Sequence, residues 1–280
     1  MVETLIVYDF LRPEEKMLVD AYKMYGISVS LVNIDSVWLP PPNGYDLAVI
    51  RPVSMFKALH ASAVIGVDSP LVVNPWITIF ASGDKIIAYS ILRENNLPIP
   101  LTYYALSSNS FLKAVSKLGT PVVTKPAYGS WGRLVSLVES LEVARIIAEH
   151  SEESKSPLIK HHVIQEYVDT GGSDIRCITC FDELVGCMIR KAAPGEWRSN
   201  IALGGRAEPL KPDKELEELV YRVMDAFKGY FLGVDFLLHP ERGYLVNEVN
   251  GVPEFKGFVK ATGINVAEKL VKKSLEEVRR

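Results

Sequence analysis

Apolar and polar positions alternate with two different periods along the first eighty residues. Short apolar runs, typical of buried strands, are separated by stretches in which apolar side chains recur every three or four residues, as on one face of a helix. Strands are predicted over residues 4–10, 28–34, 46–52 and 70–75, and helices over 14–25 and 53–66. This βαβ order favours a parallel sheet, so we expect a small open α/β domain over residues 1–83. No G-x-G-x-x-G follows the first strand, which excludes a dinucleotide fingerprint.

After residue 83 the pattern changes to antiparallel strand pairs with intervening helices. Helices are predicted from Asp84 to a proline-rich turn, and over residues 140–151, 215–229 and 264–280. Strands are predicted over residues 102–106, 121–138 (around a glycine-bearing loop), 161–168, 173–192 (a hairpin turning at Asp182-Glu183), 231–240 and 243–250. We expect a central domain over residues 84–164 and a C-terminal domain over residues 165–280, in an α/β protein of three units.

Composition and charge narrow the class of protein. The chain of 280 residues is 48% hydrophobic and 23% charged, which is typical of a globular protein. A net charge of −3 gives no signature of nucleic-acid binding. No apolar run approaches the roughly 18–20 residues that span a membrane, and the first residues lack the basic region of a signal peptide. We expect a cytoplasmic enzyme or binding protein with no nucleic-acid or membrane partner.

The three cysteines do not suggest a disulfide framework. Cys177 and Cys180 form a C-x-x-C within a predicted strand, where positions three apart face opposite sides. One zinc ion could not easily take both thiols, and no second C-x-x-C exists. We therefore expect core cysteines and no zinc site.

Two predicted strands near the end of the chain carry unusual polar residues. Asp235 interrupts one apolar strand, and Glu248 and Asn250 lie two apart on the next, with Val246 expected on the same face. If the strands pair as a hairpin, three oxygen donors converge. Such donors suit Mg²⁺ that is bound together with phosphates. Taken alone, the cluster favours a hydrogen-bonded patch or a salt bridge to a lysine over a metal site.

A second group of residues could hold a polyphosphate. Lys125 ends a predicted strand, and the small-residue loop after it lets backbone N–H groups approach phosphates closely. The loop is not a Walker A motif, because the G-K-[ST] ending is missing, and alone it could be an ordinary hairpin turn. Other polar residues follow along the chain: Gln165, Glu166, Asp174, Arg176, Arg190, Arg198 and Asn200.

The order of these parts resembles the ATP-grasp superfamily, in the branch related to RimK that contains the LysX and ArgX ligases. The motifs that carry the resemblance are "GDK", "VVTKPAYGSWGRL", "IQEYV…GGSDIR", "GGRAE", "VDF" and "NEVNGVPEFKGF". They run in family order from about residue 83 to 263. The resemblance implies the ATP-grasp fold: an N-terminal α/β open sheet, a small central lid domain and a C-terminal α+β domain.

The resemblance also implies roles for individual residues. Lys85 and Lys125 resemble the lysines that hold the phosphates of ATP. The flexible loop that closes over them corresponds to Gly129, Ser130, Trp131, Gly132, Arg133 and Leu134. The hinge beside adenine and the segment after it correspond to Gln165, Glu166, Tyr167, Val168, Asp174, Ile175 and Arg176. Arg190 and Asn200 resemble the polar groups around the transferred phosphoryl. The ligands of magnesium, with two ions implied, correspond to Asp235, Glu248 and Asn250.

The substrate end of the site is implied by "EFKGF". The residues implied to face the substrate are Arg51, Arg198, Ser199, Glu254, Phe255, Lys256, Gly257 and Phe258. In family members that use α-aminoadipate the last two positions resemble Asn followed by Ser or Thr, and in those that use glutamate they resemble Gly-Phe. A Phe that shortens the pocket by about one methylene discriminates by only roughly 1–3 kcal/mol, so dual use stays open. The alternative is that Phe258 is simply a core residue.

By resemblance, the chain is expected to use ATP and magnesium to join the α-amino group of glutamate to the γ-carboxylate of the C-terminal Glu of the carrier protein LysW, through an acyl phosphate. The alternatives are the same ligation with α-aminoadipate, and a non-catalytic ATP-binding regulator. A small acidic carrier would dock by charge, since residues 251–280 carry seven Lys or Arg against four Glu. A homo-oligomer is also expected.

Overall fold

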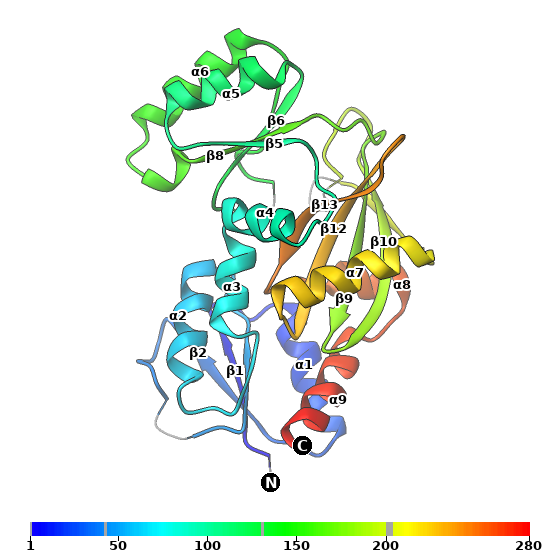
Figure 1. Ribbon diagram of the computed structural model, residues 1–280. Helices are drawn as coiled ribbons and strands as arrows, with labels where there is room; N and C mark the ends of the chain where they lie inside the picture. Colours follow the sequence, from blue (N-terminus) through cyan, green and yellow to red (C-terminus); the bar gives the residue numbers. More distant parts are fainter. Residues whose placement is uncertain (1, 42–43, 130–131, 200–203) are drawn as a thin grey trace.

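A computed structural model describes residues 2–41, 44–129, 132–199 and 204–280, arranged around three sheets (Figure 1). The first sheet is parallel, with strand order β2-β1-β3-β4. Its strands are β1 (Thr4–Tyr8), β2 (Val29–Asn33), β3 (Leu47–Ile50) and β4 (Leu71–Val73). The helices that follow these strands are α1 (Pro13–Met24), α2 (Met55–Ile65) and α3 (Trp76–Gly83). The βαβ order predicted from the sequence is therefore confirmed.

Both faces of the parallel sheet are covered, which explains why its strands are apolar throughout. Leu5 and Val7 on β1 pack in a core with α2, whereas Ile6 points to the other face. There Ile6 joins a core that also contains Leu18 of α1 and Leu270 of α9 (Val266–Val278). The C-terminal helix thus packs against the first helix of the chain, far away in sequence (Figure 1).

The second sheet is small, with order β5-β8-β6-β7 and antiparallel neighbours. Its strands are β5 (Thr102–Ala105), β6 (Val122–Pro126), β7 (Ser136–Val138) and β8 (His162–Glu166). Helices α5 (Ser108–Leu118) and α6 (Leu141–Glu153) cover one face (Figure 1), and a short 3-10 helix, η1 (Pro157–Ile159), leads into β8. The expected domain boundary at residues 164/165 falls inside β8.

The third sheet is antiparallel, with order β11-β10-β9-β12-β13. Its strands are β9 (Ser173–Cys180), β10 (Glu183–Lys191), β11 (Arg206–Leu210), β12 (Phe231–His239) and β13 (Gly243–Asn250). Helices α4 (Lys85–Glu94) and α7 (Lys214–Phe227) share a core with one face, and α8 (Lys256–Thr262) and α9 pack on the other. The predicted hairpins over residues 173–192 and 231–250 are confirmed.

Three helices, α3, α5 and α8, were not predicted from the pattern. Helix α8 has seven residues, too few for a helical period to stand out. Helix α5 opens with polar residues, and the signal for it is a cap: the Ser107 side chain accepts a hydrogen bond from the backbone N–H of Ser110 at 3.2 Å. In the described residues, no helix is both long and apolar enough to cross a membrane.

The expectation about the cysteines needs a correction. All three are buried, as expected, and Cys177 and Cys180 pack in cores on opposite faces of the sheet. However, Cys177 and Cys187 form a disulfide between β9 and β10, with their Cα atoms 4.1 Å apart. The two residues lie directly opposite each other in the antiparallel register, which brings their side chains together. Cys180 has a free buried thiol.

Candidate active site

A cavity of about 780 Å³ lies between the small sheet and the large antiparallel sheet. It brings together most of the predicted site residues, although they come from distant parts of the chain. Those that line it are Lys85, Lys125, Gly129, Gly132, Arg133, Gln165, Glu166, Tyr167, Val168, Asp174, Arg176, Arg190, Arg198, Ser199, Asp235, Glu248, Asn250, Glu254, Lys256, Gly257 and Phe258. The spacing of these residues in the sequence does not show that they line one cavity. The antiparallel pairing of β9, β10, β12 and β13 brings those of the large sheet together.

The other predicted residues either lie outside the part of the chain that the structure describes or are not among the residues that line this cavity. Ser130, Trp131 and Asn200 lie outside the described residues. Leu134 is largely exposed, and Ile175 and Phe255 are buried in cores. Arg51, expected to face the substrate, is also buried and forms an ion pair with Glu15, 3.1 Å from Nε to Oε1. That expectation is corrected because the guanidinium is directed into the interface between α1 and the segment after β13.

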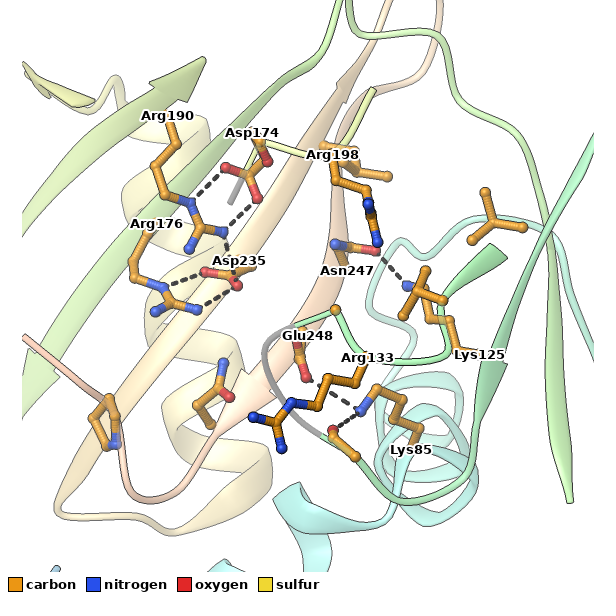
Figure 2. Close-up of a pocket in the computed structure, with 18 of the residues that line it drawn as sticks. Lys85, Lys125, Arg133, Asp174, Arg176, Arg190, Arg198, Asp235, Asn247 and Glu248 are labelled. Atoms are coloured by element: carbon orange, nitrogen blue, oxygen red, sulfur yellow. Dashed lines mark hydrogen bonds and ion pairs between the residues drawn. The ribbon is translucent and has the colours of Figure 1, made fainter. Parts of the chain in front are cut away.

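Two lysines mark one end of the cavity (Figure 2). Lys85 is the first residue of α4, whose N-cap Asp84 accepts from the N–H groups of the first turn. The Nζ of Lys85 donates to the Gly129 carbonyl at 2.7 Å and lies 3.3 Å from Glu248 Oε1. Lys125 extends from β6 and donates to Asn247 Oδ1 at 2.8 Å. Both ammonium groups are anchored by neutral or acidic partners that an anion could replace.

Burial changes the acidity of Lys125. Desolvation lowers the pKa of its ammonium to about 8, although the negative charges of Glu248, Asp235 and Asp174 oppose the shift. The side chain therefore exists as a mixture of charged and neutral forms near pH 8. A polyphosphate at this position would favour the charged form.

A β-bulge determines which residues of β13 face the cavity. Asp235 lies opposite Glu248, but the next residue, Phe236, lies opposite Val246, so Asn247 is an extra residue in the ladder. Glu248 and Asn250 both line the cavity, as predicted, and Asn247 lines it too. The expectation that Val246 shares their face is wrong, because the bulge reverses the alternation. Val246 instead packs in the core that also contains Val249.

An alternating series of charges occupies the wall formed by β9, β10 and β12 (Figure 2). The Arg190 guanidinium binds both carboxylate oxygens of Asp174, with Nε 2.7 Å from Oδ1, and its Nη2 lies 3.0 Å from Asp235 Oδ2. Arg176 binds Asp235 in the same two-pronged manner, at 2.7 and 2.6 Å. Burial alone would raise the pKa of the Asp235 carboxyl, but the two arginines outweigh it and hold that pKa at about 2. Asp235 is therefore ionised at any physiological pH.

The donor set on the hairpin fits magnesium better than a transition metal. In the part of the chain that the structure describes, no three His, Cys, Asp or Glu side chains are grouped as a metal cage. Asp235 and Glu248 are cross-strand neighbours, and the side-chain Nδ2 of Asn250 is buried without a hydrogen-bond partner. Two carboxylates and an amide are what Mg²⁺ needs when phosphate oxygens and water complete its shell. The residues present thus fit this ion, with Asn250 free to turn its oxygen inward.

Apolar residues line another part of the cavity, where an aromatic base could pack. Val123 and Val135 contribute from the region of the small sheet, and Met188 and Leu237 from the large one. The side chain of Gln165 is committed elsewhere, since its Nε2 donates to the Thr102 hydroxyl at 3.0 Å. Because β8 ends at Glu166, the backbone of the next two residues runs along the cavity as a hinge between the sheets. Backbone groups at such a hinge can recognise the edge of a base.

Asn247 and Arg12 are among the polar residues of the cavity that were not predicted from the sequence. Asn247 enters through the bulge, which no residue pattern indicated. Arg12 follows β1 and precedes α1. The position of Arg12 in the sequence could have indicated its role, because ligands bind at the carboxyl edge of the sheet in open α/β folds and Arg12 follows the first strand at that edge.

Known proteins resemble this chain along nearly its whole length. Residues 82–274 match the RimK-like ATP-grasp domain. The glutamate–LysW ligase ArgX of Sulfurisphaera tokodaii is 42% identical over 96% of this chain and 97% of its own. The α-aminoadipate–LysW ligase LysX of Saccharolobus solfataricus is 38% identical over 96% of this chain and 99% of its own. Among solved structures, a RimK domain ATP-grasp protein from Sphaerobacter thermophilus has a TM-score of 0.77 at 21% identity, covering 97% of this chain and 99% of that one.

Proposed function

Because the chain belongs to the family of RimK-like ATP-grasp ligases, we propose that it joins the α-amino group of glutamate to the γ-carboxylate of the C-terminal glutamate of a LysW carrier protein. The reaction proceeds through an acyl phosphate and serves LysW-mediated ornithine and arginine synthesis. ATP-grasp ligases form carbon–nitrogen bonds with ATP and Mg²⁺, which agrees with the predicted ATP-grasp fold and ligase activity. The observation that carries the proposal is one continuous cavity with cationic, acidic and Gly257-Phe258 walls.

The cationic wall supports the first step, transfer of the γ-phosphoryl group to the carrier carboxylate. An O–P bond forms to the carboxylate and the bond to ADP breaks, so charge shifts onto the phosphoryl oxygens and the leaving ADP. Lys85 and Lys125 lie where they can neutralise phosphate oxygens. Arg190 is held in a fixed direction by Asp174, so it can stabilise developing charge without reorganising. Arg176 is paired with Asp235, and magnesium bound at Asp235 would share that carboxylate with it.

Magnesium, held by Asp235, Glu248 and Asn250, would neutralise the β- and γ-phosphate oxygens, and we propose two ions. Lys85, 3.3 Å from Glu248, would then exchange this carboxylate for a phosphate oxygen. In the second step the neutral amine attacks the acyl carbon, a C–N bond forms, the C–O bond breaks, and inorganic phosphate leaves with the proton that the nitrogen loses. No side-chain nucleophile is required, because the substrates supply both reacting groups.

Glutamate is proposed over α-aminoadipate because Gly257 and Phe258 line the cavity. Phe258 is also a core residue, 1% exposed and packed in the cluster beneath the large sheet. The two interpretations of this residue are compatible, because Phe258 packs in the core and is also among the residues that line the cavity. The α-aminoadipate activity stays the second candidate, favoured by the similarity to LysX.

The carrier is proposed to approach the open side of the cavity by charge. The basic residues of α9 contribute less to the attraction of an acidic carrier than their number suggests, because Lys269 pairs with Glu183 and Lys273 pairs with Asp182. Lys256, which lines the cavity, is better placed to meet an acidic protein. We propose that raising the salt concentration slows the association with LysW, as expected for electrostatic steering.

The test is a phosphate-release assay with ATP, LysW and each amino acid in turn. Release that requires all three components, and is faster with glutamate, supports the proposal. Faster release with α-aminoadipate moves the chain to the second candidate. Tight ATP binding with no release under any combination favours the non-catalytic regulator. Ligation should be confirmed by the mass of the carrier, which gains one glutamate residue.

A further inference from the structure

Arg12 is a cation at the cavity that none of the roles above uses. It is the N-cap residue of α1, and it lines the cavity together with Val53, Glu254 and Lys256. Its side chain is 13% exposed. The arginine is therefore buried on most sides and open toward the cavity.

One edge of the Arg12 guanidinium is fixed by buried partners. Glu15 accepts from Nε at 3.2 Å and from Nη2 at 2.8 Å, and the carbonyl of Arg51 accepts a second bond from Nη2 at 2.8 Å. Glu15 is itself fully buried and paired with Arg51, whose Nη1 donates to the Pro253 carbonyl at 3.0 Å. This arrangement connects α1 with the segment after β13, and it leaves the Nη1 end of Arg12 directed at the cavity.

At that end Arg12 meets Glu254, with Nη1 3.3 Å from Oε1. This distance exceeds the 2.7–2.9 Å that is typical of a charge-assisted hydrogen bond, and Glu254 is 31% exposed. The pair is thus a loose, half-open contact beside a tight buried one. It joins a guanidinium and a carboxylate, the groups with which the α-carboxylate and the ammonium of an amino acid could each pair.

We propose that Arg12 binds the α-carboxylate of the amino-acid substrate and that Glu254 binds its ammonium group. The α-carboxylate and the ammonium carry no net charge together, so they can replace the loose pair with each group taking the place of the one that it displaces. Glu15 keeps Arg12 in position during the exchange. The α-amine is then held at the wall next to Gly257, while the side chain of the amino acid extends away from Arg12.

This assignment rests on the proposed function and makes it more specific. Arg12 would recognise what all α-amino acids share, and the Gly257-Phe258 region would measure the length of the side chain. Loss of Arg12 should therefore weaken glutamate and α-aminoadipate by the same factor. It should leave formation of the acyl phosphate, which needs no amino acid, unchanged.

The experiment compares glutamate with its α-amide, which lacks only the α-carboxylate charge, in the wild type and in Arg12→Gln. We expect the wild type to prefer glutamate by about 10- to 100-fold in kcat/KM, the range for one charge-assisted contact, and Arg12→Gln to lose most of that preference. Arg12→Lys keeps the charge and should recover part of it. Arg280→Gln, which removes an exposed arginine that also pairs with a Glu three residues away, is the matched control and should behave as wild type.

Hydroxylamine separates failure of this inference from failure of the proposed function. With ATP and LysW but no amino acid, it traps the acyl phosphate as a hydroxamate on the carrier. No hydroxamate in the wild type would reject the proposed function itself. Equal hydroxamate in the wild type and Arg12→Gln, with the preference for glutamate over its α-amide unchanged, would overturn the role of Arg12. The role of Arg12 would also be overturned if Arg12→Gln kept the preference for glutamate over its α-amide and instead lost the preference for glutamate over glutamine, the side-chain amide.

Discussion

Nucleotide affinity should depend on pH through Lys125. In the free protein its pKa is lowered to about 8, chiefly by burial. The charged form is the one that binds phosphate oxygens, so above pH 8 the neutral lysine must take up a proton when nucleotide binds. Because of this linkage, the apparent Kd is multiplied by 1 + 10^(pH − pKa), where the pKa is that of Lys125 in the free protein. That factor is about 1.3 at pH 7.5 and about 33 at pH 9.5, a loss of affinity of roughly 25-fold.

The assay is calorimetric titration of a non-hydrolysable ATP analogue with magnesium between pH 7.5 and 9.5, a range in which the phosphates are already fully ionised. Repeating the titration in buffers of different ionisation enthalpy counts the protons taken up, about half a proton per nucleotide at pH 8. Lys125→Arg stays charged over the range and should lose the pH dependence. Lys125→Met should bind weakly at every pH. A flat profile for the wild type, or the same slope in Lys125→Arg, would refute the reasoning.

Three further changes test other parts of the molecule. Glu248→Gln should reduce ligation by at least about a thousandfold with little change in the melting temperature, since the side chain is partly exposed; near-normal turnover at ordinary magnesium would remove Glu248 from the metal site. Replacing Gly257-Phe258 with Asn-Ser should shift the kcat/KM ratio toward α-aminoadipate by tenfold to a hundredfold on the methylene scale, and should cost about 3–5 kcal/mol in a denaturant titration because the ring is buried; an unchanged ratio places the determinant elsewhere. Reducing the disulfide between Cys177 and Cys187 should lower the free energy of unfolding by about 3 kcal/mol, as expected for a closed loop of this length, and an unchanged denaturation midpoint on reduction would contradict this.

The parallel sheet and the antiparallel hairpins could be predicted because their residue patterns are strong. Continuous apolar runs separated by helical periods leave few alternatives for residues 1–83. In the case of β12 and β13, the antiparallel pairing of the two strands followed from alternation and a short turn, whereas the position of Asp235 opposite Glu248 depends on the bulge. These are properties that neighbouring residues determine among themselves.

The remainder depends on contacts between segments far apart in the chain, which a linear pattern does not contain. Arg51 ends a strand, and nothing nearby shows that Glu15 will bury its charge. Cys177 and Cys187 pair only because the hairpin register sets them opposite each other. Val246 was placed on the wrong face because one residue of bulge is enough to reverse every side chain beyond it.

The bulge at Asn247 has a consequence for which lengths of this chain can vary. Val246 and Val249 must both reach one core while Glu248 and Asn250 reach the cavity, and a regular strand cannot satisfy both demands. Removing one residue from this stretch would sacrifice either the packing or the site, and lengthening it by one would do the same. The turn between β12 and β13 lies outside this stretch, and its Arg242 pairs with Glu166 at the edge of the cavity. We therefore expect an insertion at the turn to put this ion pair at risk but to leave the alternation of β13 intact, whereas the spacing from Val246 to Asn250 is fixed by the core and the cavity at once.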